Sequence, residues 1–333
     1  MTASYSASDF DAALARLPRV RLVPEATPIH RLDRLRDSLG GPNRVPTLLV
    51  KRDDLNGVAL GGNKLRKLEW LFADALEQGA DVLLTAGAAQ SNHCRQTAGV
   101  GSMLGLETHL CLRGPEPARR TGNLILDDWL GAALHFAPEG EDVSGYMDVL
   151  ATGMRAEGRR PYVISIGGSN AVGAVGFAAA VREMAHDQRT IPDYLVVATG
   201  SGGTQSGLEA GVRLLGLTTR IHGMGVALPD TVSWEVDVAT LANATLARLG
   251  APDWVTPSDV YCPMEYMGER YGASTPAGEE ALRLLARTEG IFLDPVYSGK
   301  AFAGLLGGVA SGLYSPTATV LFWHTGGVPA LFA

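Results

Sequence analysis

The stretch YLVVATGSGGTQSG, residues 194–207, shows most directly how this chain folds. Its first six residues are mostly apolar or β-branched and lack the alternation of a half-exposed strand, so they predict a strand that is buried on both faces. A glycine-rich turn follows at once and opens a segment of small residues that has a helical pattern. A buried strand, a tight turn and a helix in this order are typical of a parallel α/β sheet.

Similar short apolar runs recur over most of the chain. Helical segments lie between them, and in one of these Leu65, Leu68 and Phe72 share an apolar face. Alternation of strands and helices at this density predicts an α/β fold in which parallel sheets carry helices on both faces. The predicted strands are 47–51, 82–86, 107–112, 133–137, 162–166, 194–199, 221–226 and 319–323.

Length and composition narrow the class of protein. A chain of 333 residues is long enough for two packed units of about 150 residues each. The 28 Lys and Arg residues against 35 Asp and Glu give a net charge of −7, which argues against a nucleic acid or an anionic membrane as the partner. The 41 glycines are nearly twice the usual share of roughly 7%.

Three cysteines, Cys94, Cys111 and Cys262, are too few and too scattered for a disulfide framework, and no pair has the spacing of a zinc site. We therefore expect free thiols in a reducing compartment and no metal. The first residues lack the continuous apolar block of a secretory signal, and no stretch is long and apolar enough to span a bilayer. These features predict a cytoplasmic protein.

Two glycine-rich loops could carry chemistry. In Gly61-Gly62-Asn63-Lys64, Asn63 is expected to cap a helix and to leave Lys64 in its first turn, where a cation is unfavourable. Desolvation there would lower the pKa of Lys64 and favour imine formation, although a solvated surface lysine is the simpler reading. The loop 199–204 predicts an anion cradle, with an empty turn as the alternative, and it fits neither a Walker loop nor GxGxxG.

Two further loops carry polar and aromatic side chains. Ser91 and Asn92 precede a predicted helix that either of them could simply cap, and His93 is expected to be structural because no GxSxG elbow accompanies it. Tyr297, in the loop 294–300, could stack on a flat ring or could merely be packed. Together, an imine-forming amine, a phosphate cradle and an aromatic face describe one ligand, pyridoxal 5′-phosphate.

The chain resembles the 1-aminocyclopropane-1-carboxylate deaminase and D-cysteine desulfhydrase family of fold-type II pyridoxal-phosphate enzymes. The resemblance runs from Pro28 to the terminal GGVPALF and rests on the motifs KRDDLNG, GGNKLRKLE, AAQSNHCRQTA, GGSNAVGAVGF, GSGGTQSG, EGIFLDPVYSGKAFAGL and HTGG. It implies a tryptophan synthase β-like architecture with a large cofactor-binding domain (1–66 and 176–333) and a small mobile domain (67–175). It also implies a homodimer.

The resemblance assigns roles to single positions. Lys64 matches the Schiff-base lysine, Asn92 the partner of the cofactor's phenolic oxygen, and Ser91 a residue that contacts substrate and assists proton transfer. Tyr297 matches the tyrosine stacked on the pyridine ring, and Tyr271 matches a second active-site tyrosine, with Tyr266 as a nearby alternative. The positions that match the phosphate loop are Gly200, Ser201, Gly202, Gly203 and Thr204.

Two positions separate the subfamilies that this chain resembles. Similar deaminases carry Glu after the DPVY tyrosine and Leu in the last motif, whereas this chain has Ser298 and Thr325, the desulfhydrase-like pair that would face the cofactor ring. A neutral hydroxyl near the ring nitrogen makes a weaker electron sink than a carboxylate does, which suffices when a thiolate leaves.

We therefore expect β-elimination from a small 3-substituted amino acid, most simply D-cysteine, to give pyruvate, ammonia and sulfide. Alternatives with the same cofactor are L-cysteate sulfo-lyase, 1-aminocyclopropane-1-carboxylate deaminase and a racemase-like reaction. A nicotinamide-dependent oxidoreductase is disfavoured because no GxGxxG with a downstream acid is present. A silent binding protein of the same fold is disfavoured because Lys64, Ser91 and Tyr297 are all present.

Overall fold

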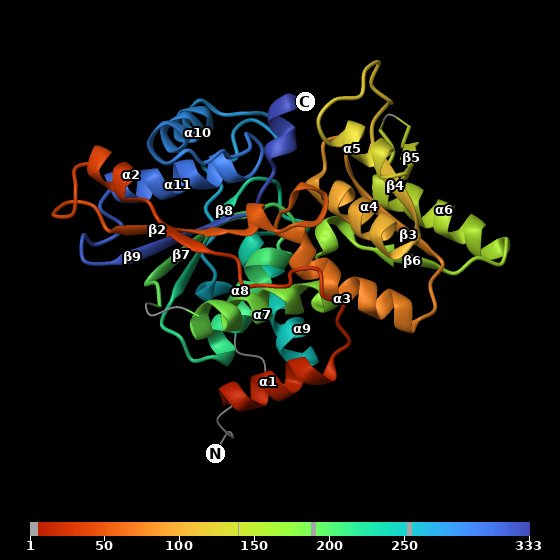
Figure 1. The fold of residues 1–333 in the computed structure, drawn as a ribbon, viewed down its shortest axis with the longest axis horizontal. Coiled ribbons are helices and arrows are strands. Elements are labelled where there is room, and N and C mark those ends of the chain that lie inside the picture. Colours follow the sequence, from red (N-terminus) through yellow and green to blue (C-terminus); the bar gives the residue numbers. More distant parts are fainter. Residues whose placement is uncertain (1–5, 139, 188–190, 252–254) are drawn as a thin grey trace.

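The computed structural model describes residues 6–138, 140–187, 191–251 and 255–333, which form two sheets (Figure 1). The first five residues, part of the stretch that argued against a secretory signal, lie outside the described residues. The first sheet has the order β1-β2-β9-β7-β8, and the second has the order β5-β4-β3-β6. The strands are β1 (Ile29–Arg31), β2 (Thr47–Arg52), β3 (Val82–Ala88), β4 (Glu107–Arg113), β5 (Ala133–Phe136), β6 (Pro161–Ile164), β7 (Tyr194–Thr199), β8 (Arg220–Gly225) and β9 (Thr319–His324).

The predicted fold is confirmed. All eight predicted strands are present, with ends within one or two residues of the expected ones, and every pairing among them is parallel. The short edge strand β1 was missed, and it pairs with β2 in the antiparallel direction. Its three residues, Ile29, His30 and Arg31, are too few to show a period, and two of them are exposed.

Helices cover both faces of the first sheet (Figure 1). Val196 of β7 packs into a core with residues of the helices on one face, whereas its neighbours Leu195 and Val197 pack against the other face. One face carries α2 (Asp33–Ser38), α10 (Pro276–Glu289) and α11 (Ser298–Ala310), and the other carries α7 (Ala171–Asp187) and α8 (Gly203–Leu214), on which α1 (Ala7–Arg16) and α9 (Trp234–Arg248) pack in turn.

The second sheet is also covered on both faces. Leu84 of β3 packs against α6, whereas Leu83 packs against α3. One face carries α6 (Val143–Ala156), and the other carries α3 (Lys64–Glu77), α4 (Asn92–Leu104) and α5 (Asn123–Trp129). Short 3-10 helices complete the described secondary structure: η1 (Asp53–Leu55), η2 (Val58–Leu60), η3 (Ile166–Gly168), η4 (Pro257–Asp259) and η5 (Val328–Phe332).

The four strands of the second sheet all lie between residues 67 and 175. The two predicted domain boundaries, 66/67 and 175/176, fall inside α3 and α7. These helices pack so closely that a side chain at Gly176 would collide with the backbone oxygen of Arg66. The division into a large unit and a small mobile unit stays a prediction. Cys94, Cys111 and Cys262 are free and buried, as expected. Within the described ranges, every helix is too short or too polar to cross a membrane.

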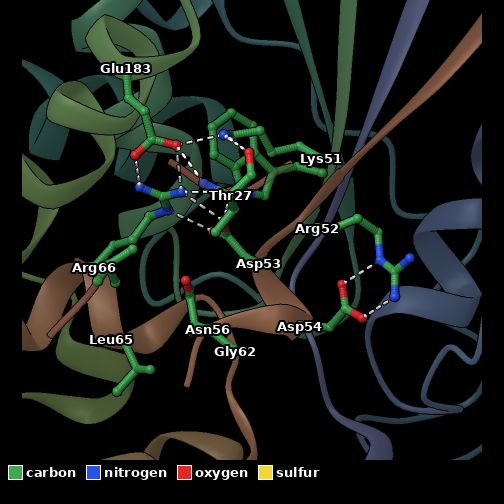
Figure 2. A network of polar contacts seen from close by, with 12 residues as sticks. Thr27, Lys51, Arg52, Asp53, Asp54, Asn56, Gly62, Leu65, Arg66 and Glu183 are labelled. Carbon is green, nitrogen blue, oxygen red and sulfur yellow. Dashed lines mark hydrogen bonds and ion pairs between the residues drawn. The ribbon is translucent and has the colours of Figure 1, made fainter. Parts of the chain in front are cut away.

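A buried network of charged side chains holds the start of α3 (Figure 2). Arg66 donates through Nε and Nη2 to Asp53 at 2.8 Å each, and through Nη1 to Glu183 of α7 at 2.7 Å. Lys51 of β2 donates to the same Glu183 at 2.5 Å and to the backbone oxygen of Thr27 at 2.6 Å. Two cations therefore balance two anions, as buried charges require. The network fixes the first turn of α3 to β2, η1 and α7.

Candidate active site

A cavity of about 910 Å³ opens where the loops that follow β3, β7 and β9 meet. Residues from both sheets line this cavity. A crevice at the carboxyl ends of parallel strands is the usual place for a ligand in an α/β protein. The residues singled out in the sequence that line the cavity are Asn63, Lys64, Ser91, Asn92, His93, Gly200, Ser201, Gly202, Thr204, Tyr271, Tyr297 and Thr325, whereas Gly203 and Ser298 do not.

Lys64 is the first residue of α3 and reaches the cavity. Burial lowers the pKa of its amine to about 8, so an appreciable share is neutral and nucleophilic near neutral pH. Among the described residues, none accepts a hydrogen bond from its Nζ. Asn63 lies at the N-cap position, as expected, but its side chain makes no capping bond: the amide instead donates to Oγ1 of Thr204 at 3.1 Å. Asn63 thus joins the lysine loop to the start of α8.

The loop that follows β7 leads into the positive end of α8. Gly202 has a φ of 71°, a left-handed conformation that favours glycine, and Gly203 begins the helix. A side chain on Gly203 would lie 2.6 Å from Oγ of Ser169 and 2.9 Å from Nζ of Lys67. Oγ of Ser201 lies 2.8 Å from Oγ of the same Ser169. Backbone N–H groups, hydroxyls and a nearby amine therefore surround a place where a phosphate fits.

Two tyrosines that line the cavity are in contact with each other. The hydroxyl groups of Tyr271 and Tyr297 are hydrogen-bonded, and their rings lie 5.8 Å apart at an angle of 65°. Burial raises the pKa of both phenols, so both stay protonated at neutral pH. Tyr266 packs against the core under α11, and its hydroxyl lies beside Gly307. The structure therefore brings Tyr271, and not Tyr266, to the cavity.

The start of α4 brings a serine and an amide to the cavity. Oγ of Ser91 accepts the N–H of Cys94 at 3.2 Å, so Ser91 caps the helix and still lines the cavity. Asn92 follows it and lines the same wall. The ring of His93 is held by Oγ1 of Thr85 at 2.8 Å, and His93 also lines the cavity.

Comparisons with known proteins agree with this geometry. A family model described as "Pyridoxal-phosphate dependent enzyme" matches residues 20–326. The chain belongs to this family. It is 43% identical over 328 residues to a D-cysteine desulfhydrase of Serratia proteamaculans (strain 568), with 96% of this chain and 97% of the relative covered. It is 40% identical over 327 residues to a D-cysteine desulfhydrase of Salmonella newport (strain SL254), with the same coverage.

Solved structures extend the comparison. A crystal structure described as an ACC deaminase homologue superposes with a TM-score of 0.89 at 38% identity, covering 97% of this chain and 96% of that one. A pyridoxal 5′-phosphate-dependent aspartate racemase superposes with a TM-score of 0.68 at 14% identity, covering 97% and 95%, and shows the shared fold alone. The predictions of a fold-type II architecture, of an enzyme and of pyridoxal phosphate as its cofactor are confirmed.

The residues of this family member fit the cofactor. The unpartnered amine of Lys64 suits an aldehyde, and the loop before α8 suits a phosphate. Ser298 behaves differently from the sequence expectation, because its Oγ donates to Oδ2 of Asp294 at 2.6 Å and accepts the N–H of Asp294 at 2.8 Å. The hydroxyl of Ser298 is therefore bonded to Asp294, and of the pair Ser298 and Thr325 only Thr325 lines the cavity.

Sequence reasoning missed one buried cation of this pyridoxal-phosphate enzyme. Lys67 is fully buried, and its Nζ donates to the backbone oxygen of Gly167 at 2.9 Å and to Oγ of Ser169 at 3.0 Å. Burial and the charge of Lys64 lower its pKa well below the ordinary value. The signal was the three-residue spacing from Lys64, which places both amines on one side of α3. Lys67 lies under the glycine loop, where a bound phosphate would favour the protonated form of its amine.

Proposed function

We propose that this pyridoxal-phosphate enzyme is a carbon–sulfur lyase that converts D-cysteine and water into pyruvate, ammonia and hydrogen sulfide. The observation that carries the proposal is the buried, unpartnered amine of Lys64 in one cavity with the protonated Tyr271–Tyr297 pair. The choice of substrate rests on the names of the relatives that are 40–43% identical over nearly their whole length.

We assign the cofactor contacts as follows. Lys64 would hold the aldehyde, Asn92 would contact the phenolic oxygen, the ring of Tyr297 would stack on the pyridine, and Thr325 would contact the cofactor ring. The phosphate would lie against Gly200, Ser201, Gly202, Gly203 and Thr204. When bound, pyridoxal phosphate supplies a carbonyl that links to amines and a ring that accepts electron density from the substrate.

The side chains then divide the proton transfers. The amine of Lys64, with its pKa near 8, can take the Cα proton of the amino acid, and Oγ of Ser91 lies in the same cavity to assist. A phenol of the Tyr271–Tyr297 pair can donate a proton to the departing sulfur, because both groups stay protonated. The C–S bond breaks, sulfur leaves as sulfide, and the released three-carbon enamine hydrolyses to pyruvate and ammonia.

Deamination of 1-aminocyclopropane-1-carboxylate is the second candidate, since the structure superposes well on the ACC deaminase homologue. This chain has Ser298 where similar deaminases carry Glu, and this difference favours the lyase, because a neutral group makes a weaker electron sink than a carboxylate does. The discriminating experiment offers D-cysteine, L-cysteate and 1-aminocyclopropane-1-carboxylate to one enzyme batch and measures sulfide, sulfite and 2-oxobutanoate. Lys64→Ala serves as the control. Sulfide from D-cysteine as the main product supports the proposal, and 2-oxobutanoate or sulfite as the main product overturns it.

We also infer that the enzyme works as a homodimer in the cytoplasm. Two large apolar side chains support an interface: Trp129 at the end of α5 is 79% exposed, and Phe332 in η5 is 72% exposed. Free thiols support a reducing compartment. Light scattering of the purified protein should give twice the mass of 35.0 kDa, and a monomer at assay concentration would contradict the interface.

A further inference from the structure

A second buried polar network lies beside Asn92, and neither the sequence nor the proposed reaction accounts for it. Arg95 of α4 donates through Nε to Oδ1 of Asn123 at 2.8 Å. Asn123, the first residue of α5, donates through Nδ2 to Oδ1 of Asn92 at 2.9 Å and to the backbone oxygen of Gln90 at 2.9 Å. Arg95 and Asn123 are fully buried, and Asn92 is 7% exposed.

The chemistry of the partners determines which way each amide points. A guanidinium has only donors, so the atom of Asn123 that faces Arg95 must be the oxygen. A backbone carbonyl has only acceptors, so the atom that faces Gln90 must be the nitrogen. The same nitrogen of Asn123 also donates to Asn92, so the atom of Asn92 that accepts this bond must be its oxygen. The nitrogen of Asn92 is left over, and among the described residues none accepts a hydrogen bond from it, while Asn92 lines the cavity.

The same guanidinium also holds the loop that precedes the lysine. Arg95 donates to the backbone oxygen of Ala59 and, at 3.1 Å, to that of Gly61. Ala59 and Leu60 have φ values of 47° and 61°, which residues with a side chain rarely adopt, so this turn needs outside support. One buried cation thus connects the backbone that leads to Lys64 with the amide of Asn92.

We propose that Arg95 and Asn123 are positioning residues that fix the polarity of Asn92, so that Asn92 presents an N–H donor to an anionic oxygen of the bound cofactor. The inference rests on the proposed cofactor contacts. Without the relay, the amide of Asn92 could turn over and present its oxygen, which would repel an anionic oxygen. A purely structural role, in which the network only joins α4 to α5, predicts loss of stability and no change at the cofactor.

The test compares Asn123→Asp and Asn123→Ala with Asn243→Asp. A carboxylate at position 123 keeps an acceptor for Arg95 but offers Asn92 an acceptor too, which turns the Asn92 amide round. Asn123→Ala removes the relay without reversing it and decides the question if the first variant does not fold. Asn243 is a matched control, because both atoms of its amide bond to the backbone of Val255 and it does not line the cavity.

Each protein is incubated with pyridoxal phosphate, and two quantities are measured besides activity: the dissociation constant by equilibrium dialysis, and the pH at which the visible absorption band titrates. A hydrogen bond to a charged group is worth about a tenfold to a hundredfold change in affinity, so we expect Asn123→Ala to weaken binding by about tenfold and Asn123→Asp by more. Losing a donor disfavours the deprotonated oxygen, so the titration should move upward by about one pH unit.

The outcomes separate the two proposals. If wild-type protein takes up pyridoxal phosphate and both Asn123 variants match Asn243→Asp in affinity and in titration, the positioning role is wrong and the proposed function stands. If wild-type protein takes up no pyridoxal phosphate, both the proposed function and the positioning role fail. Weaker binding and a raised titration in the Asn123 variants alone support the relay.

Discussion

Arg66→Met tests how strongly the buried network holds the start of α3. The guanidinium makes two hydrogen bonds to Asp53, two to Glu183 and one to Thr27, and its side chain is only 3% exposed. Methionine keeps much of the volume but leaves two carboxylates facing the single cation of Lys51. Removing one partner from a buried ion pair costs about 3–5 kcal/mol, and we expect a loss of unfolding free energy in that range.

Urea unfolding of the wild-type protein and of Arg66→Met at neutral pH measures this loss. Arg283→Met is the matched control, because Arg283 pairs with Glu279 on the surface of α10 with side-chain exposures of 62% and 44%. Exposed pairs of this kind contribute only about 0.3–0.5 kcal/mol. If the two variants lose the same stability, the network does not stabilise the helix that carries Lys64, and the argument from buried charges is refuted.

Further predictions concern the lysine, the phosphate loop and acid. Lys64→Ala should leave the urea midpoint nearly unchanged, while borohydride no longer links pyridoxal phosphate to the chain and sulfide release stops. Gly203→Ala should weaken cofactor binding by about tenfold in equilibrium dialysis, since the new carbon would lie 2.6 Å from Oγ of Ser169. Burial opposes ionisation of Asp53, yet the neighbouring guanidinium lowers its pKa below the ordinary value. Its stabilising effect is therefore present above the ordinary carboxylate pKa and lost as the pH falls through the lowered one; a stability profile in acid that is the same for Asp53→Asn would contradict this.

The sequence predicted the architecture well because buried parallel strands leave a strong local signal. Runs such as 194–199 are mostly apolar or β-branched, and their ends in the structure lie where the pattern changes. β1 escaped because it is short and held by its pairing with β2, which is a tertiary effect. The convergence of Lys64, Ser91 and Tyr297 on one cavity followed from the rule that parallel strands present their following loops at one edge.

Side-chain directions could not be predicted in the same way. Asn63 is of a residue type that often caps helices, but its side-chain amide donates to Oγ1 of Thr204, 141 positions further on. Ser298 directly follows Tyr297, yet its hydroxyl donates to Asp294 and does not line the cavity. In each case a hydrogen-bond partner brought in by the fold decided the outcome, and a single sequence contains no information about which partner that is.

The long helix α3 has a consequence for movement within the molecule. The ion pair of Arg66 with Asp53 joins the first turn of α3 to the first sheet, while Leu68 and Phe72 in its later turns pack against the second sheet. A rotation of the second sheet relative to the first would therefore twist α3 and move Lys64, its first residue. A substitution that changed how the two sheets sit relative to each other would therefore also change the direction of the Lys64 amine in the cavity.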